Sequence, residues 1–262
     1  MSPENQFQRL ELMLGREKLE RLQNAFVVIV GLGAVGGYVT EALARAGIQK
    51  LRLVDHDVVR PSNINRQLFA TWDTVGQMKC EVAAARVQSI FPNCQVEILN
   101  LFVHEETVSR VLLNFGAQKP DFVVDAIDSL NPKIALIRAV LDAGVPLISS
   151  MGAALRTDPS LVRIGPLSEA TYCPLAAILR KHLRRRQIPV DFDCVYSSEP
   201  VRELHRDAVL PPDESEDNFL GKGRKRSSLG SLPTLTGIFG LTAANHVLMK
   251  LLERFNSSPE RK

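Results

Sequence analysis

A glycine-rich turn follows the first apolar run of the chain and restricts the fold more than any other feature. The residues from Ala25 to Val30 are all apolar, and Gly31-Leu32-Gly33-Ala34-Val35-Gly36 comes directly after them. This order predicts a buried strand, a tight turn and the start of a helix. Gly31 makes the turn, Gly33 lets a phosphate or ribose approach the backbone, and Gly36 lets the helix pack on the strand. The pattern predicts a nucleotide-binding fold.

A second predicted strand, from Lys50 to Asp55, ends in an acidic residue. This acid lies about twenty residues beyond the glycines, where a carboxylate can accept hydrogen bonds from ribose hydroxyls. Further polar residues stand at or just after the ends of predicted strands: Asp57, Asp125, Asp128 and Ser149. Ligands of open parallel sheets bind at the carboxyl ends of the strands, so we expect these side chains to share one edge of the sheet.

Predicted strands and helices alternate through the first half of the chain. Later strands are expected at 95–101, 121–128 and 145–150, and helices at 76–91, 105–115 and 131–144. The alternation predicts an α/β fold: a doubly wound, mostly parallel sheet with a Rossmann-like core. A C-terminal α+β extension is expected to follow, with a helix beginning at Pro174 and a strand at 194–199.

The chain is expected to have three parts. Residues 1–24 form an N-terminal helical arm, residues 25–155 the nucleotide-binding core, and residues 156–262 an extension of the same domain for substrate binding and dimerisation. The extension includes a predicted mobile loop at 200–230, which is rich in Pro, Asp, Glu, Lys and Ser. The final helix, Leu235 to Leu252, carries too many polar residues for a simple membrane span, so we expect it to pack on the domain or on a partner subunit.

Composition excludes several classes of protein. A formal net charge of +3 is too small for a protein that coats nucleic acid along its whole length. The 4 cysteines form no C-x-x-C pair, so no zinc is expected. The first residues lack the basic head and apolar core of a signal peptide, which indicates a cytoplasmic protein. Two basic runs, 180–186 and 222–226, fit either a solvated face or a surface that binds RNA phosphates.

Residue types that bind polyphosphate follow the second strand. Asn63, Arg66 and Gln67 lie close together, and Lys79 comes near the start of a predicted helix. Each alone fits an ordinary turn or surface residue, but together they supply the cations and amides that ATP requires. Asp128 can hold Mg²⁺. No Ser-His-Asp pattern is evident, and a carboxylate that attacks the α-phosphate needs no base, so the set indicates adenylyl transfer.

These motifs resemble a known family. GLGAVG, VDHDVVRPSNINRQ, VGQMK and VDAID are similar to the adenylation core of ubiquitin-activating-type enzymes, over about residues 7–155. The resemblance implies that Asp55 contacts the ribose and that Asp128 orders Mg²⁺. It implies phosphate contacts from four residues: Asn63, Arg66, Gln67 and Lys79. The family also uses an arginine from the partner subunit's N-terminal arm, and Arg9 occupies the matching place, which implies a homodimer.

The second half of the chain resembles one branch of that family. ISSMGAALRTDPS, CPLAAILRKHLRRR and CVYSSEP are similar to tRNA threonylcarbamoyladenosine dehydratases. The resemblance implies an ATP-dependent adenylating ligase and cyclodehydratase that activates the threonyl carboxylate of a modified tRNA adenosine. Lys181, Arg184 and Arg185 would then bind tRNA phosphates.

Other functions stay open on the sequence alone. The chain could activate a ubiquitin-like sulfur-carrier protein, with Cys173 as a thiol that receives the carrier or sulfur. It could be an NAD-binding Rossmann dehydrogenase, although Arg66 and Lys79 argue against this. It could also be a scaffold that binds a nucleotide without turnover.

Overall fold

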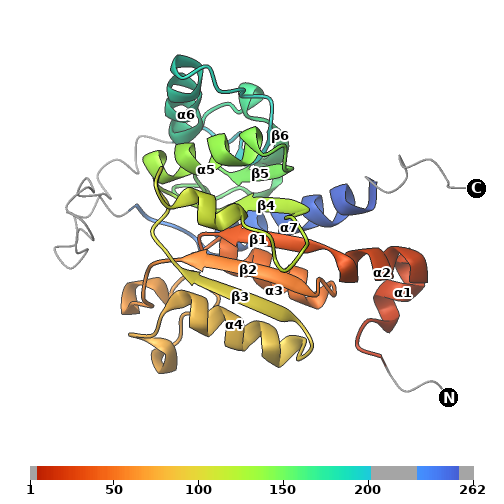
Figure 1. Cartoon of the computed structure of the whole chain (residues 1–262). Helices are drawn as coiled ribbons and strands as arrows, with labels where there is room; N and C mark the ends of the chain where they lie inside the picture. The colour runs from red at the N-terminus through yellow and green to blue at the C-terminus, as the bar shows by residue number, and fades with distance from the viewer. Residues whose placement is uncertain (1–4, 202–228, 254–262) are drawn as a thin grey trace, which may run out of the picture.

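A seven-stranded sheet forms the centre of the molecule, with helices on both faces (Figure 1). The structure is a computed structural model that describes residues 5–201 and 229–253. The strand order is β3-β2-β1-β4-β5-β7-β6. The strands are β1 (Phe26–Val30), β2 (Lys50–Asp55), β3 (Gln95–Asn100), β4 (Phe122–Asp125), β5 (Leu147–Ser150), β6 (Val162–Pro166) and β7 (Asp193–Ser197).

The order of the strands reverses beside β1. Strand β1 pairs in parallel with β2 on one side and with β4 on the other. The chain leaving β1 and the chain leaving β4 therefore turn toward opposite faces at the carboxyl edge, which is the place where ligands of such sheets bind. Among the strands of the described residues, β6 alone is antiparallel, against β7. The prediction of a doubly wound, mostly parallel sheet is confirmed.

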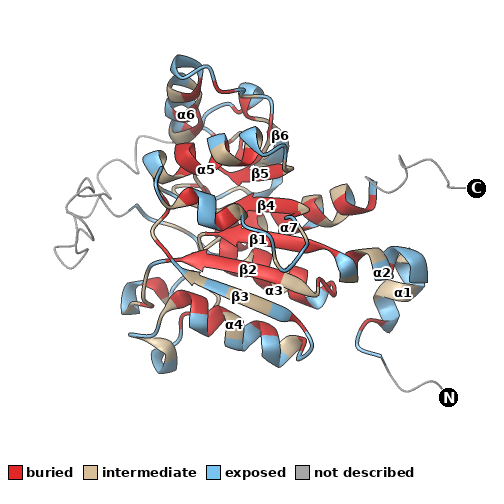
Figure 2. Ribbon diagram, in the orientation of Figure 1, coloured by how far each residue is buried: buried red, intermediate tan, exposed pale blue. Residues whose placement is uncertain are grey.

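Two separate cores explain why β1 is continuously apolar. All five of its residues are buried. Val27 and Ile29 pack into one core, whereas Phe26, Val28 and Val30 pack into the other. A strand covered on both faces has no polar side, so the alternation typical of a half-exposed strand is absent here. Figure 2 shows the same burial along the middle of the sheet.

The helices divide between the two faces. Helices α2 (Arg16–Asn24), α3 (Gly36–Arg45), α4 (Lys79–Ile90) and α7 (Pro233–Glu253) contribute to the first core. Helices α5 (Leu130–Asp142) and α6 (Pro174–Arg185) contribute to the second. Short 3-10 turns η1 to η5 occupy Pro61–Asn63, Trp72–Thr74, Val108–Leu112, Pro159–Leu161 and Leu167–Glu169.

Helix α7 packs inside the molecule, as the sequence suggested. Within the described residues it is the helix long and apolar enough to cross a membrane, but 56% of its most apolar window is buried. It contacts α3, α2 and strands of the sheet. The N-terminal arm is helical too, although Gly15, at φ 82°, divides it into α1 (Gln8–Leu14) and α2.

The prediction of a helix over 105–115 is wrong. Only the short turn η3 forms there. The buried guanidinium of Arg52 donates to the carbonyl oxygens of Val111 at 2.9 Å and Asn114 at 3.4 Å. Those carbonyls therefore point at a side chain from β2 rather than along a helix axis, which ends the turn.

The boundary between core and extension stays a prediction. Strands β6 and β7 belong to the same sheet as the core, and α7 packs against α3. Most of the predicted loop at 200–230, including the basic run 222–226, lies outside the described residues.

The cysteines of the two cores yield a first prediction. Burial raises the pKa of Cys80, Cys94 and Cys194 to about 12. At about pH 8 these thiols stay protonated, and thiolate is the reactive form. We expect Ellman's reagent to modify at most one thiol per folded chain and all four in denaturant. Rapid reaction of two or more thiols in native buffer would contradict this.

Candidate functional site

The turn after β1 has space for a ligand above one of its glycines. Gly31 has φ 91°, and a Cβ there would lie 2.7 Å from the carbonyl oxygen of Ala126. A Cβ on Gly36 would lie 1.7 Å from the carbonyl oxygen of Gly31. At Gly33 the nearest atom to such a Cβ is Nε2 of Gln67, at 3.7 Å. The fold thus requires glycine at positions 31 and 36. At Gly33, by contrast, the nearest atom belongs to the side chain of Gln67, so no other backbone of the described residues packs against this glycine.

Asp55 connects the ends of β1 and β2. Its Oδ2 accepts a hydrogen bond from the backbone N–H of Leu32 at 2.7 Å, and its Oδ1 accepts one from Asp57 N–H at 2.9 Å. The residue is 9% exposed. Asp55, the residue predicted to contact the ribose, therefore also holds the glycine turn in place.

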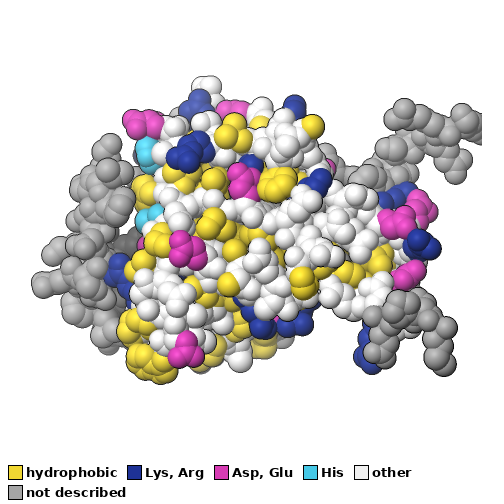
Figure 3. All heavy atoms as spheres, turned by 60° about the horizontal axis from the view of Figure 1, so that its bottom comes forward, with side chains coloured by type: hydrophobic (Ala, Val, Ile, Leu, Met, Phe, Trp, Pro, Cys, Tyr) yellow, Lys and Arg dark blue, Asp and Glu magenta, His cyan; other side chains and the backbone are white. Residues whose placement is uncertain are grey.

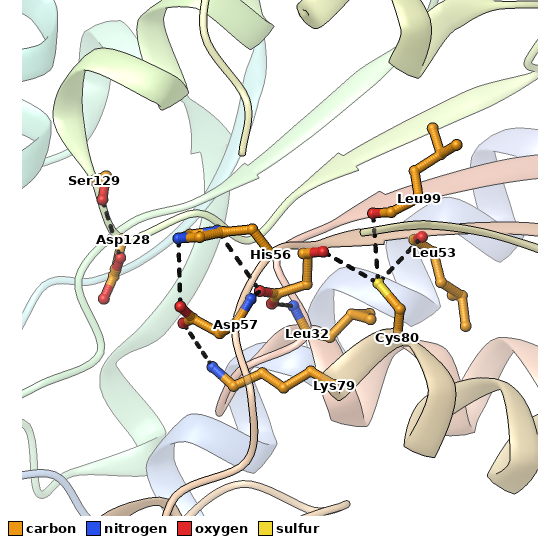
Figure 4. Close-up of polar contacts among 10 residues, drawn as sticks. Leu32, Leu53, His56, Asp57, Lys79, Cys80, Leu99, Asp128 and Ser129 are labelled. Carbon is orange, nitrogen blue, oxygen red and sulfur yellow. Dashed lines mark hydrogen bonds and ion pairs between the residues drawn. The ribbon is translucent and has the colours of Figure 1, made fainter. Parts of the chain in front are cut away.

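Asp57 and Lys79 form an ion pair beside this turn (Figure 4). Nζ of Lys79 lies 2.9 Å from Oδ2 of Asp57, and Nε2 of His56 lies 3.3 Å from its Oδ1. Burial raises the pKa of Asp57, but the charge and hydrogen bond of Lys79, together with the charges of His56 and Arg60, lower it more, so the net pKa is lowered. Lys79 is 8% exposed. A cation kept ready at a nucleotide edge can exchange its carboxylate partner for a phosphate.

The segment from Asn63 to Gln67 follows η1 near the glycine turn. Oδ1 of Asn63 accepts the N–H of Arg60 at 3.1 Å, so this buried side chain shapes its own turn. Gln67 lies over Gly33. Arg66 donates to the carbonyl of Ser62 at 2.8 Å and to Oδ1 of Asn65 at 2.9 Å. Its guanidinium thus contacts its own turn, and a phosphate contact from Arg66 stays a prediction.

Asp128 lies in the loop after β4, at the same carboxyl edge. Figure 4 shows it on the side that faces His56 and Asp57. Its side chain is exposed, and the hydroxyl of Ser129 lies 3.5 Å from its Oδ1. Mg²⁺ prefers carboxylate oxygen and retains several waters, so an accessible carboxylate in this position fits that ion.

A buried ion pair supports the Asp128 loop, and sequence reasoning missed it. Lys133 and Asp125 are 0% exposed, with Nζ 2.6 Å from Oδ2. The same Oδ2 accepts the hydroxyl of Ser149 at 2.6 Å, and Oδ1 of Asp125 accepts the N–H of Ile127 at 3.1 Å. Asp125 and Ser149 are therefore bound to Lys133 inside the fold. The sequence signal that could have revealed this ion pair is the position of Lys133 directly before the apolar residues Ile134 to Ile137.

Arg9 does not reach this edge within one chain. It is exposed on α1, and the arm precedes β1, whereas the glycine turn follows β1 (Figure 1). Helix α2 and strand β1 lie between them along the chain, and the five residues of β1 alone span roughly 16 Å.

Helix α6 begins at Pro174, as predicted, and exposes its cations. Lys181, Arg184 and Arg185 are exposed, while Ala176, Leu179 and Leu183 face the core. Cys173, directly before the helix, is 3% exposed. A buried thiol is poorly placed to receive a carrier protein.

The family model for the ThiF family matches residues 4–262. The chain belongs to the ThiF family. Some relatives resemble nearly the whole chain. The tRNA threonylcarbamoyladenosine dehydratase of Bacillus subtilis is 37% identical over 249 residues, which is 95% of each protein.

A solved ThiF-family structure has the same fold. The E. coli tRNA N6-threonylcarbamoyladenosine dehydratase TcdA in complex with ATP has a TM-score of 0.80 and 31% identity, and the match covers 96% of this chain and 95% of that one. Its complex with AMP has a TM-score of 0.81, at 31% identity, over 97% and 96% of the two chains.

Other relatives match a shorter part of the chain. The sulfur carrier protein adenylyltransferase of Thermus thermophilus is 34% identical over 145 residues, which is 55% of this chain and 51% of that protein. That match covers 55% of this chain, whereas the match to the Bacillus subtilis dehydratase covers 95%.

The buried ion pair leads to a second prediction. Lys133→Met leaves the Asp125 carboxylate buried without its cation, which we expect to cost about 3–5 kcal/mol of unfolding free energy. Adding Asp125→Asn should recover much of that loss, because the charge is then absent. Urea unfolding followed by circular dichroism measures both.

Lys119→Met is the matched control, since Lys119 is exposed just before β4. It should change stability by less than about 0.5 kcal/mol. Equal stabilities for Lys133→Met and Lys119→Met would refute the assigned role of the ion pair.

Proposed function

We propose that this protein is an ATP-dependent tRNA threonylcarbamoyladenosine dehydratase. The observation that carries the proposal is similarity over nearly the whole chain to enzymes of that name, including one solved with ATP and with AMP. An oxygen of the threonyl carboxylate attacks the α-phosphate of ATP, and pyrophosphate leaves. The neighbouring ureido group of the same nucleotide then attacks the activated carbonyl carbon, a ring closes and AMP leaves. The nucleophile belongs to the substrate, so the protein need not supply one.

The carboxyl edge of the sheet supports this chemistry by position and charge. In the proposal, Asp55 receives the ribose hydroxyls, and the backbone at Gly33 lies against the nucleotide. Four residues contact the phosphates: Asn63, Arg66, Gln67 and Lys79. Negative charge on the triphosphate competes with Asp57 for Lys79, so Asp57 acts as the resting counter-ion. Fixed donors of this kind stabilise charge that develops in the transition state.

Magnesium and a second subunit complete the proposed site. Asp128 is the residue we propose to hold Mg²⁺, which when bound offsets the charge of the phosphates. Arg9 is too far from the glycine turn of its own chain, so we propose a homodimer in which each arm serves the partner's site. The enzyme would work in the cytoplasm, where tRNA and ATP are available.

The tRNA is proposed to bind along α6. Lys181, Arg184 and Arg185 form an exposed cationic cluster on a helix otherwise anchored by apolar residues. On the side of the molecule that Figure 3 turns toward the viewer, by contrast, acidic and basic side chains are interspersed. RNA phosphates bind more favourably to an exposed cluster of cations, such as that on α6, than to a surface of mixed charge.

Activation of a sulfur-carrier protein is the second candidate. Similarity to a sulfur carrier protein adenylyltransferase supports it, but that similarity covers only 55% of this chain. The deciding experiment uses tRNA that carries threonylcarbamoyladenosine, with ATP, Mg²⁺ and the purified protein. Mass spectrometry of the nucleosides should show a product lighter by one water. Unchanged nucleosides, with pyrophosphate exchange that depends on a carrier protein, would support the alternative.

Arg66 provides a third prediction. Arg66→Ala should remove a phosphate contact that strengthens as charge moves at the α-phosphate, a loss of about 2–4 kcal/mol or a hundredfold or more in rate. Steady-state kinetics on the tRNA substrate measures it. Arg163→Ala is the control, because Arg163 is an exposed arginine that, like Arg66, donates to a nearby carbonyl, that of Val162. Near-normal turnover by folded Arg66→Ala would remove Arg66 from the site.

The cations of α6 provide a fourth prediction. Replacing Lys181, Arg184 and Arg185 with Ala should weaken tRNA binding and flatten its dependence on salt, because fewer counterions are released. ATP affinity should stay the same. A control variant with equal loss of charge replaces Lys18, Arg45 and Lys119, which are exposed cations outside α6. If both triple variants bind tRNA alike at every salt concentration, α6 is only a solvated face.

A further inference from the structure

One buried guanidinium connects the three segments that mark the second half of the chain. Arg156 follows β5, is 2% exposed, and donates through Nη1 to the carbonyl of Glu199, which follows β7. Through Nη2 it donates to the carbonyl of Tyr172 at 2.6 Å, just before α6. The carboxylate of Glu199 accepts the N–H of Thr157 at 2.8 Å in return. The start of α6 is thereby attached to the carboxyl edge of the sheet.

The residue held by this clamp has an unusual conformation. Tyr172 has φ 53°, in the left-handed region that residues other than glycine avoid. Its side chain is 63% exposed, so its ring adds little to either core. Nε of Arg156 is buried without a hydrogen-bond partner among the described residues. The fold thus tolerates both a left-handed aromatic residue and an unpaired donor to keep Tyr172 in this position.

Tyr172 stands at one end of an exposed face of α6. The exposed residues of the helix recur at helical spacing from this end onward: Pro174, Ala177, Ile178, Lys181, Arg184 and Arg185. Cys173 Sγ lies 3.8 Å from where a Cβ on Gly152 would be, and Gly152 follows β5 at the carboxyl edge. The aromatic end of the face therefore lies toward the site edge. The cations lie further along the helix, out to roughly 15 Å at about 1.5 Å per residue.

We propose that Tyr172 is a stacking platform for an unpaired nucleobase of the RNA substrate, next to the nucleotide that reacts. An exposed ring followed by cations matches a single strand, whose bases stack on aromatic side chains while its phosphates contact Lys and Arg. The clamp by Arg156 fixes the backbone of Tyr172 before the RNA arrives, which lowers the entropy cost of binding. This inference rests on the proposed function and adds a recognition residue to it.

The left-handed backbone offers a variant that removes the ring without harm to the fold. Glycine adopts positive φ freely, so Tyr172→Gly should be at least as stable as the parent protein in thermal unfolding. The probe is an RNA hairpin with threonylcarbamoyladenosine in its loop and 2-aminopurine as the adjacent base. We expect Tyr172→Gly to bind it about tenfold or more weakly, with ATP affinity unchanged. Quenching of 2-aminopurine on binding should be lost as well.

Two further variants separate stacking from bulk. Tyr172→Phe keeps the aromatic face and should retain affinity and quenching. Tyr172→Leu keeps an apolar side chain without that face and should behave like Tyr172→Gly. Parent-like affinity and quenching in Tyr172→Gly, in a protein that still dehydrates the RNA, would overturn the inference and leave the proposed function intact. If the parent protein neither binds nor converts the RNA, both fail together.

Discussion

The carboxylate of Asp55 holds the nucleotide edge together. One oxygen binds the glycine turn after β1, and the other binds the chain that leaves β2. Asp125 has the equivalent place at the end of β4, where it fixes the following loop and is neutralised by Lys133. These two carboxylates set the positions of Gly33, Asp57 and Asp128 before any ligand arrives. Pre-set geometry of this kind is what a reaction without a protein nucleophile depends on.

The charges at the edge differ in how readily they can move. Lys133 is fully buried and serves the fold, whereas Lys79 is paired with a partly exposed aspartate beside the glycine turn. Arg66 lies on its own turn, close to the surface. The pair formed by Lys133 is therefore fixed, whereas Lys79 and Arg66 have partners that water reaches. The difference lies in the partners, since the Asp125 side chain is 0% exposed and that of Asp57 is 42% exposed, and separating a fully buried ion pair costs far more than separating one that water reaches.

Local patterns predicted elements in both halves of the chain. The bounds of β2 and the start of α6 agree with the sequence, because a strand-end acid, a proline and an apolar run are local signals. The helix over 105–115 failed because Arg52, distant in sequence, draws the carbonyls of that segment away. Lys133 and Arg156 escaped notice for the same reason: their partners lie in other elements, and sequence spacing does not show such contacts. The roles of Arg66 and Arg9 are not visible from one chain without a ligand.

The reversed strand β6 has a consequence for how this fold can vary. If β6 ran in the same direction as β5, a crossover connection, usually a helix, would have to lead the chain from the carboxyl edge back to the start of β6. Here the chain leaves β5 at the carboxyl edge and runs along β6 toward the opposite edge. It then returns to the carboxyl edge at the start of α6, and α6 leads it away again before β7 begins. The second half thus visits the carboxyl edge three times, at 151–161, 172–174 and 198–201. Each visit can change length or sequence without shifting the register of β1 to β5, so one adenylation scaffold can be refitted to different acids.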